Sequence, residues 1–348
     1  AMQEVRVAIV GMGIGKANAL AISRNHRGRV VALCDLLEDR MIDFAADLPE
    51  PVQMFTDYKE MCRSQEIDAV FVGTPNQFHV PVAMEALRQG KHVLVTKPLA
   101  DGEEPAKQLV ELAESTGLVN MMSLSTRFSV GVQHLGQMGQ RGEFGEIYYA
   151  RARSIRRQGI PAWSPGFILK GGGAFRDMGV HVLDSAWWLL GMPEPVSVTG
   201  VAGAKFGPLG KGYWGKGAPP APEYYRQFAA DDYGSGFIRF ANGAGLQVES
   251  FWASHQPGEV NIELFGTEAG AQLRPLTIYR MNGAMEENAT IEMPENANLL
   301  AWDNVAGHFI DSILDGTPCI APLRHGWLVQ RMMEGLLRSA ETGQEVRL

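Results

Sequence analysis

The chain has 348 residues, of which 45% are hydrophobic and 20% charged, and its formal net charge is -8. A chain of this length is too long for one ordinary hydrophobic core, so we predict two domains. The composition is typical of a soluble globular protein. The longest basic cluster is Arg156–Arg157, so we expect no nucleic-acid partner. The apolar runs are far shorter than the ~20 residues of a membrane span, so we expect no membrane partner.

Three cysteines, Cys34, Cys62 and Cys319, are widely separated and odd in number. They show neither the spacing of a metal site nor a disulfide framework, so no metal is expected and a reducing compartment is favoured. The chain enters a strand pattern almost at once, without the charged and apolar regions of a secretory leader. We therefore predict a cytoplasmic location.

The first part of the chain alternates strand and helix patterns. The expected strands are Val5–Val10, Val30–Cys34, Ala69–Val72, His92–Thr96 and Val119–Ser123. The expected helices are Lys16–Arg24, Leu36–Asp47, Val80–Gln89 and Glu103–Thr116. Such alternation predicts an α/β domain with a doubly wound parallel sheet, the Rossmann arrangement, over residues 1–124.

Beyond about residue 125 the pattern changes, and residues 125–348 are expected to form a second, α+β domain. Strands are expected at Ile147–Ser154, Gly236–Phe240, Gly245–Trp252, Val260–Phe265 and Thr277–Met281, and helices at Phe175–Leu190, Leu299–Leu314 and Gly326–Ala340. This pattern predicts a mixed or antiparallel sheet with helices on one face. The aromatic, aperiodic stretch Lys205–Ala230 is expected to serve as a lid or an oligomer contact.

A glycine loop follows the first strand and precedes the first helix, with Gly11, Gly13, Ile14 and Gly15 as its main residues. Such glycines let the backbone approach a pyrophosphate, whose charge the helix N-terminus attracts. Asp35 ends the next strand, where its carboxylate can bind a ribose diol and repel a 2′-phosphate, which favours NAD over NADP. The alternative is a plain glycine-rich turn in a domain that binds another ligand.

Further polar residues lie where the next strands end, and ligands bind parallel sheets at that edge. They are Thr74, Asn76 and Lys97. Pro98 restricts Lys97, whose ammonium group can polarise a hydroxyl or carbonyl oxygen or relay a proton. The alternative is a solvated surface lysine.

The stretch from Gly171 to Asp184 begins with three glycines and continues as a helix pattern. On a helix, Asp177, His181 and Asp184 share one face. A carboxylate one turn from a histidine can hold its tautomer, which suits a general base that removes a hydroxyl proton. His181 could instead be a core histidine, or the three residues could bind a metal.

The ordered motifs resemble the Gfo/Idh/MocA oxidoreductases across nearly the whole chain. They are residues 74–79 (TPNQFH), residues 90–98 (GKHVLVTKP) and the triple-glycine stretch. The resemblance implies a large, mostly antiparallel open sheet in the second domain, which often joins subunits into a homodimer or homotetramer. It also implies NAD or NADP and hydride exchange with a secondary hydroxyl of a sugar, cyclitol or related polyol. This chain departs from the family at Thr96, where a glutamate is usual, and in its short glycine loop.

Site residues are carried over by matching positions. Lys97, Asp177 and His181 match the family's catalytic group, Asn76 and His79 match its nicotinamide-side loop, and Arg127 matches an arginine near the active site. Arg127, Asp177 and His181 are also substrate candidates. Trp163 and His255 are added as substrate candidates from the sequence itself, without a family match, because an aromatic ring in a loop can stack on a sugar. Alternatives left open are glycoside cleavage by transient oxidation, a non-catalytic sugar sensor, and a metal-dependent lyase or isomerase.

Overall fold

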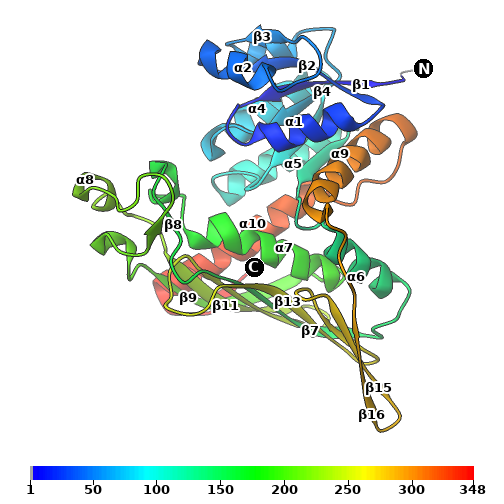
Figure 1. Cartoon of the computed structure of the whole chain (residues 1–348), viewed down its shortest axis with the longest axis vertical. Helices are drawn as coiled ribbons and strands as arrows, with labels where there is room; N and C mark the ends of the chain where they lie inside the picture. Colours follow the sequence, from blue (N-terminus) through cyan, green and yellow to red (C-terminus); the bar gives the residue numbers. More distant parts are fainter. Residues whose placement is uncertain (1–2) are drawn as a thin grey trace. The chain divides into compact units, whose positions relative to one another are not determined.

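A computed structural model describes residues 3–348 of the chain, which fall into two compact units. The first unit contains a six-stranded parallel sheet with the strand order β3-β2-β1-β4-β5-β6 (Figure 1). Its strands are β1 (Val5–Val10), β2 (Gly28–Cys34), β3 (Gln53–Phe55), β4 (Ala69–Val72), β5 (His92–Thr96) and β6 (Asn120–Ser123). The predicted Rossmann arrangement is confirmed.

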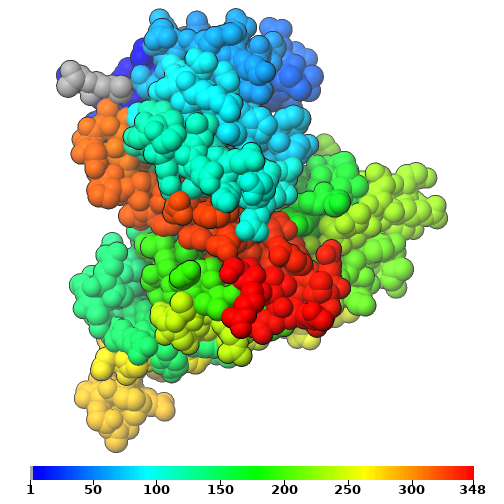
Figure 2. Space-filling model, turned by 180° about the vertical axis from the view of Figure 1, so that it is seen from behind, coloured from blue at the N-terminus to red at the C-terminus, as the bar shows by residue number. Residues whose placement is uncertain are grey.

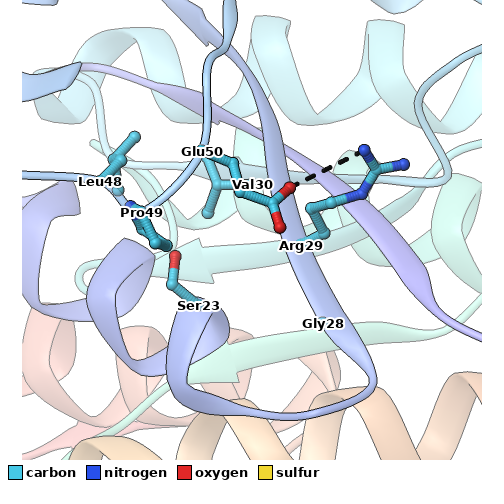
Figure 3. Close-up of a pocket in the computed structure, with 7 residues that line it drawn as sticks. All are labelled: Ser23, Gly28, Arg29, Val30, Leu48, Pro49 and Glu50. Atoms are coloured by element: carbon cyan, nitrogen blue, oxygen red, sulfur yellow. Dashed lines mark ion pairs between the residues drawn. The ribbon is translucent and has the colours of Figure 1, made fainter.

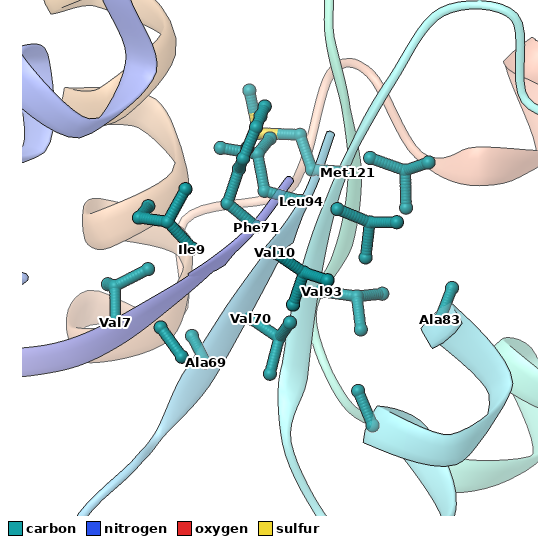
Figure 4. Packing of buried hydrophobic residues seen from close by; sticks show 14 of the residues in the cluster. Val7, Ile9, Val10, Ala69, Val70, Phe71, Ala83, Val93, Leu94 and Met121 are labelled. Carbon is teal, nitrogen blue, oxygen red and sulfur yellow. The ribbon is translucent and has the colours of Figure 1, made fainter. Parts of the chain in front are cut away.

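The helices of this unit flank its sheet. They are α1 (Gly15–Arg24), α2 (Glu38–Ala45), α3 (Tyr58–Cys62), α4 (His79–Arg88), α5 (Glu103–Thr116) and α9 (Ala297–Asp315), with the 3-10 turn η1 (Asn76–Phe78) before α4. The central strands are buried on both faces, and their aliphatic side chains interlock with those of the helices (Figure 4). Such continuous apolar runs are typical of parallel strands covered on both sides.

The described part of the first unit is made of two stretches of chain, 3–129 and 296–330. Helix α9, from the second stretch, packs on α1, and Figure 2 shows this orange segment against the blue and cyan residues of the same unit. Ion pairs add to the contact, Arg24 with Asp303 at 2.6 Å and Arg27 with Asp315 at 2.8 Å. By packing, residues 296–330 therefore belong with the Rossmann sheet, whereas the sequence division at residue 124 assigned them to the second domain.

The second unit contains residues 130–295 and 331–348 and is built on a nine-stranded sheet. The strand order is β16-β15-β14-β13-β7-β12-β11-β9-β17, and only the β7–β12 pair is parallel. The strands are β7 (Ile147–Ile155), β9 (Pro195–Gly203), β11 (Tyr233–Phe240), β12 (Gly245–Phe251), β13 (Glu259–Gly266), β14 (Gly270–Gln272), β15 (Thr277–Asn282), β16 (Met285–Thr290) and β17 (Val346–Arg347). The mostly antiparallel sheet expected from the family is confirmed.

Helices pack against this sheet, chiefly α7 (Val180–Leu189) on β7, β12 and β13. The end of α10 (Leu323–Thr342) contacts β9 through a hydrogen bond from the Gly200 N–H to Oγ of Ser339, and α6 (Val130–Gln140) packs on α7. The short helix α8 (Pro222–Tyr225) contacts the turn at residues 207–209. The predicted helix Phe175–Leu190 divides into a π-helical turn η3 (Phe175–Gly179) and α7. Single π turns inside helices occur frequently at functional sites.

Residues from 160–168 and 206–228 share a small apolar cluster with Trp252 in the second unit. Short elements order it: β8 (Ile160–Pro161), η2 (Pro165–Phe167), η4 (Gly207–Leu209), β10 (Tyr213–Trp214) and α8. The buried carboxylate of Asp232 accepts hydrogen bonds from the backbone N–H groups of residues 205, 206 and 207. This stretch is therefore ordered, and its role as a lid or an oligomer contact stays a prediction.

Within residues 3–348, no helix combines the length and the apolar character that a bilayer span requires.

Candidate functional site

The glycine loop joins β1 to α1 and brings two strand ends close together. Gly11 has φ +91°, and a Cβ on it would lie 2.4 Å from the carbonyl oxygen of Gly73, so only glycine fits. A Cβ on Gly15 would lie 2.8 Å from Cγ2 of Ile9, so Gly15 permits close packing of helix on strand. Gly15 therefore supplies the small residue that close packing of the helix requires, one position before the usual third small residue of the motif.

The outer side of this loop is open to a ligand. Around Gly13, nothing lies within 4 Å of the place a Cβ would occupy. Helix α1 begins directly after Ile14 and has no side-chain cap, so its first N–H groups are available to an anion. The open loop and the uncapped helix fit a pyrophosphate.

Asp35 follows β2 and lies beside the glycine loop. Its Oδ2 accepts a hydrogen bond from the Met12 N–H at 3.3 Å, and its Oδ1 accepts from the Leu37 N–H at 3.0 Å. These bonds orient a half-buried carboxylate at the carboxyl end of the sheet. This orientation fits the predicted contact with a ribose diol, which stays a prediction.

Thr74 lies just beyond the end of β4. It follows Gly73, whose backbone lies close to that of Gly11. Its Oγ1 is buried and has no hydrogen-bond partner among residues 3–348. A buried hydroxyl without a partner is costly, and a bound ligand would supply one. Together with the glycine cradle, this orphaned hydroxyl fits a bound dinucleotide. Asn76, two residues on, is half-buried and begins η1.

His79 is completely buried, and both of its ring nitrogens are engaged by the chain itself. Nδ1 lies 2.7 Å from the carbonyl oxygen of Pro98 and Nε2 lies 2.7 Å from that of Thr74. Lys97 follows the last residue of β5, is half-buried, and precedes Pro98 in a cis peptide. The structure thus brings Thr74, His79 and the Lys97–Pro98 turn together at the carboxyl end of the sheet.

In the second unit, Asp177 lies in the π turn and His181 in the first turn of α7. The indole Nε1 of Trp252 donates a hydrogen bond to Oδ2 of Asp177 at 3.0 Å. Asp184, on the same helix, is buried. Over residues 3–348, no three His, Cys, Asp or Glu side chains meet in an arrangement that could hold a metal ion.

Asp231 holds the start of this helical segment. Its Oδ2 accepts a hydrogen bond from the Phe175 N–H at 2.9 Å, and its backbone carbonyl accepts from the Ala174 N–H at 2.9 Å. A Cβ on Gly173 would lie 2.2 Å from Oδ1 of Asp231, so the glycine stretch lets this carboxylate reach the helix. Burial raises the pKa of Asp231 to about 6.

Of the remaining substrate candidates, Arg127 is completely buried. Its Nη1 donates to the Ile320 carbonyl at 2.8 Å and lies 2.9 Å from Nδ1 of His325. Burial, and next the charge of Arg127, lower the pKa of His325 to about 4, so a neutral imidazole accepts this bond. Arg127 thus has a structural task in the first unit, and its contact with substrate stays a prediction.

The two other candidates lie on the surface of the second unit. Trp163 is 45% exposed and meets Trp214, itself 55% exposed, edge to face at 5.3 Å. His255 is exposed, has φ +57°, and stands edge to face with Phe206 at 5.2 Å. Their contacts with substrate also stay predictions.

The sequence reasoning missed Trp252, Asp231 and Asp232. Trp252 is 75 residues from Asp177, and Asp231 is 56 residues from Phe175. No local spacing signals contacts at such separations. The one available sign was a pair of adjacent acids directly before a strand, at residues 231–232.

A small hollow in the first unit lies beside the start of β2 (Figure 3). It is lined by Ser23, Gly28, Arg29, Val30, Leu48, Pro49 and Glu50. Gly28 begins β2, so the hollow is near the amino end of a strand, whereas ligands bind such sheets at the carboxyl ends. Arg29 and Glu50, 3.9 Å apart, form an ion pair across it. We therefore do not assign it to the functional site.

Comparison with known proteins agrees with this geometry. Residues 5–124 match the model of an oxidoreductase family with an NAD-binding Rossmann fold, and residues 132–272 match the GFO/IDH/MocA C-terminal domain. D-glucoside 3-dehydrogenase of Escherichia coli (strain K12) is 31% identical over 99% of this chain and 97% of its own length. The scyllo-inositol 2-dehydrogenase (NAD(+)) of Bacillus subtilis (strain 168) is 28% identical over 76% of this chain and 72% of its own.

Solved structures share the fold over the full length. Levoglucosan dehydrogenase in complex with NADH and L-sorbose has a TM-score of 0.84 and 23% identity, and 99% of each chain is covered. The family matches confirm the predicted oxidoreductase function and NAD as the cofactor. The chain belongs to the Gfo/Idh/MocA family of oxidoreductases.

Proposed function

We propose that this enzyme oxidises a secondary ring hydroxyl of a D-glucoside, with NAD as the hydride acceptor. The similarity to D-glucoside 3-dehydrogenase over nearly the whole of both chains carries this proposal. It is supported by the presence of Lys97, Asp177 and His181 at the family's catalytic positions. The orientation of Asp35 beside the glycine loop supports NAD over NADP, because its charge repels a 2′-phosphate.

In this proposal, residues Gly11 to Gly15, Asp35 and the Thr74 hydroxyl hold the dinucleotide. When bound, NAD supplies the hydride acceptor. His181 accepts the proton of the substrate hydroxyl, Asp177 stabilises the resulting imidazolium, and Lys97 stabilises negative charge on the substrate oxygen. Lys97 and His181 could exchange these roles. Asn76 would contact the nicotinamide side, and Arg127, Trp163 and His255 remain substrate candidates.

The test is a substrate panel. The purified enzyme is incubated with NAD and with D-glucosides, free D-glucose, inositols and glycerol, and the absorbance of NADH is followed. We expect NADH formation to be fastest with a D-glucoside. Absence of NADH with every sugar and cyclitol would refute the proposal, and consumption of glucoside without NADH would favour cleavage by transient oxidation.

A variant tests the assigned lysine. Lys97→Met should reduce turnover by about 100-fold or more, in the range for loss of a proton-transfer group, while NAD still binds. Retained turnover would remove Lys97 from the mechanism. Loss of NAD binding as well would show that Lys97 serves the cofactor rather than the reaction.

We also propose that the enzyme is a cytoplasmic homo-oligomer. Helices cover one face of the nine-stranded sheet, and a second copy would cover the other, which carries half-buried aromatic residues such as Tyr149 and Phe237. Burial raises the pKa of the Cys34 and Cys62 thiols to about 12, which suits unreactive thiols in a reducing compartment. Light scattering after size exclusion tests the oligomer, with a monomer as the contradicting result, and cell fractionation tests the location.

A further inference from the structure

The His79 ring spans two loops that follow neighbouring strands of the first unit. Nε2 faces the carbonyl of Thr74, which lies two residues after the end of β4. Nδ1 faces the carbonyl of Pro98, the residue after Lys97. Both nitrogen–oxygen distances are 2.7 Å, and the ring is completely buried. One side chain therefore joins the loop that carries Thr74 and Asn76 to the turn that carries Lys97.

Carbonyl oxygens only accept hydrogen bonds, so both contacts are hydrogen bonds only if both ring nitrogens carry a proton. A neutral imidazole has one N–H, and its other nitrogen would turn a lone pair toward a carbonyl oxygen at 2.7 Å. That arrangement is repulsive in a buried site, where no water relieves it.

We propose that His79 is a positioning residue which, as an imidazolium, donates to both carbonyls and so fixes Lys97 and the Thr74–Asn76 loop in their working positions. The part of this proposal that concerns Lys97 rests on the proposed function. The proton state and the two hydrogen bonds stand on the geometry of the first unit alone.

The charges around the ring act in both directions. Burial is the main effect on the pKa of His79 and lowers it, and the positive charge of Lys97 lowers it further. The carbonyls of Pro98 and Thr74 and the charge of Asp101 raise this pKa, and the sum of all these effects lowers it. We give the two short contacts more weight than the lowered pKa, because a neutral ring would leave one of these contacts without a proton.

Nuclear magnetic resonance of the enzyme labelled with ¹⁵N-histidine reads the proton state directly. His79 is assigned among the eight histidines by the signal that His79→Gln removes. We expect both ring nitrogens of His79 to be of the protonated type at neutral pH. One nitrogen of the unprotonated type would overturn the imidazolium clamp.

His92 provides an internal reference in the same spectrum. It begins β5, is half-buried, and accepts a hydrogen bond from the Val119 N–H on Nδ1 at 2.9 Å, so its Nδ1 must be unprotonated. If His79→Gln fails to fold, His79 is assigned by its proximity to residues 74 and 98, and the wild-type spectrum still decides.

Kinetics test the positioning role. In His79→Gln, an amide replaces the ring and cannot reach both carbonyls, so kcat per folded site should fall about tenfold or more, as for a displaced catalytic group. NAD binding should weaken by a smaller factor than the fall in kcat, since only the contact of Thr74 is disturbed while the glycine loop and Asp35 are intact. The matched control is His92→Gln, which removes a half-buried histidine at the start of β5 and should keep kcat within about twofold.

The outcomes separate this proposal from the proposed function. An unchanged kcat in folded His79→Gln overturns the positioning role. Equal losses of kcat in both variants reduce His79 to a structural residue and overturn it as well. If no sugar is oxidised, the proposed function fails, and the imidazolium is still confirmed or refuted by the spectrum.

Discussion

Trp252 donates a hydrogen bond from its indole Nε1 to Oδ2 of Asp177 at 3.0 Å, across 75 residues of sequence. Trp252 directly follows β12 and is completely buried. It belongs to the same apolar cluster as Met178, the neighbour of Asp177 in the sequence. The backbone N–H of Trp252 in turn donates to the carbonyl of Asp232 at 2.9 Å. The carboxylate proposed to stabilise the imidazolium of His181 is thus held by a rigid, buried partner.

Trp252→Phe tests this contact, since it removes the N–H donor and keeps most of the ring. A hydrogen bond to a charged group contributes about 1.5–3 kcal/mol, so we expect kcat to fall about 10- to 100-fold, with a smaller change in the KM for the sugar. The matched control is Trp187→Phe, because Trp187 is equally buried and its Nε1 donates to the Pro193 carbonyl at 2.9 Å. Equal kinetic losses in both variants would show a general packing effect.

The first unit was accessible to sequence reasoning because its signals are local. Each predicted strand ends within a residue or two of the observed one, since buried β-branched runs bounded by glycine or a polar residue leave little freedom. The sequence analysis did not predict β3 and α3, because elements of three and five residues are too short to show a periodic pattern. The glycine loop and Asp35 were found because the fold determines their spacing.

The second unit was less accessible, since its elements depend on distant partners. Helix α6 contains Gly131, Gly136 and Gly139, which are poor helix formers, and β9 begins at Pro195. A Cβ on Gly136 would lie 2.6 Å from the Trp188 ring, so this glycine serves helix packing and not a turn. The contacts of Asp177 and Phe175 likewise come from residues far along the chain, which a single sequence does not reveal.

The glycine cradle yields a second prediction. Gly11→Ala introduces a Cβ 2.4 Å from the Gly73 carbonyl oxygen at a φ of +91°, so we expect loss of NAD binding by at least about tenfold and a destabilisation of several kcal/mol. The control is Gly90→Ala, at φ +78° with nothing within 4 Å, which should lose only about 1–2 kcal/mol. NAD affinity by calorimetry and thermal unfolding check both. Unchanged NAD affinity in Gly11→Ala would remove the loop from the cofactor site.

Cofactor choice provides a third prediction. Asp35→Asn keeps the shape of the side chain and one acceptor oxygen, enough for the N–H of either Met12 or Leu37, and removes the charge that repels a 2′-phosphate. We expect the ratio of kcat/KM for NAD to that for NADP to fall about tenfold, which corresponds to about 1.4 kcal/mol. The exposed neighbour Asp39 supplies the control variant Asp39→Asn. A ratio that is the same in Asp35→Asn and the wild type would show that Asp35 does not face the ribose.

Asp231 makes the stability of the second unit depend on pH. Burial is the main cause that raises its pKa from 3.8 to about 6, against the opposing effects of the Phe175 N–H and Arg176. A carboxyl whose pKa is higher in the folded state binds a proton more tightly there, so the folded protein is favoured while Asp231 is protonated. The stabilisation of the folded state by the proton on Asp231 is fully present below about pH 4 and is lost as the pH rises through about 6.

Asp231→Asn should remove this dependence, because the amide oxygen can still accept from the Phe175 N–H and carries no charge at any pH. The decrease in the free energy of unfolding between pH 4 and pH 7 should be smaller in the variant than in the wild type, by about 2–3 kcal/mol. Denaturant unfolding followed by tryptophan fluorescence at several pH values measures it. The exposed acid Asp43 provides the control variant Asp43→Asn. Parallel pH curves for the wild type and Asp231→Asn would show that Asp231 keeps its charge when buried, stabilised by the Phe175 N–H that donates to it.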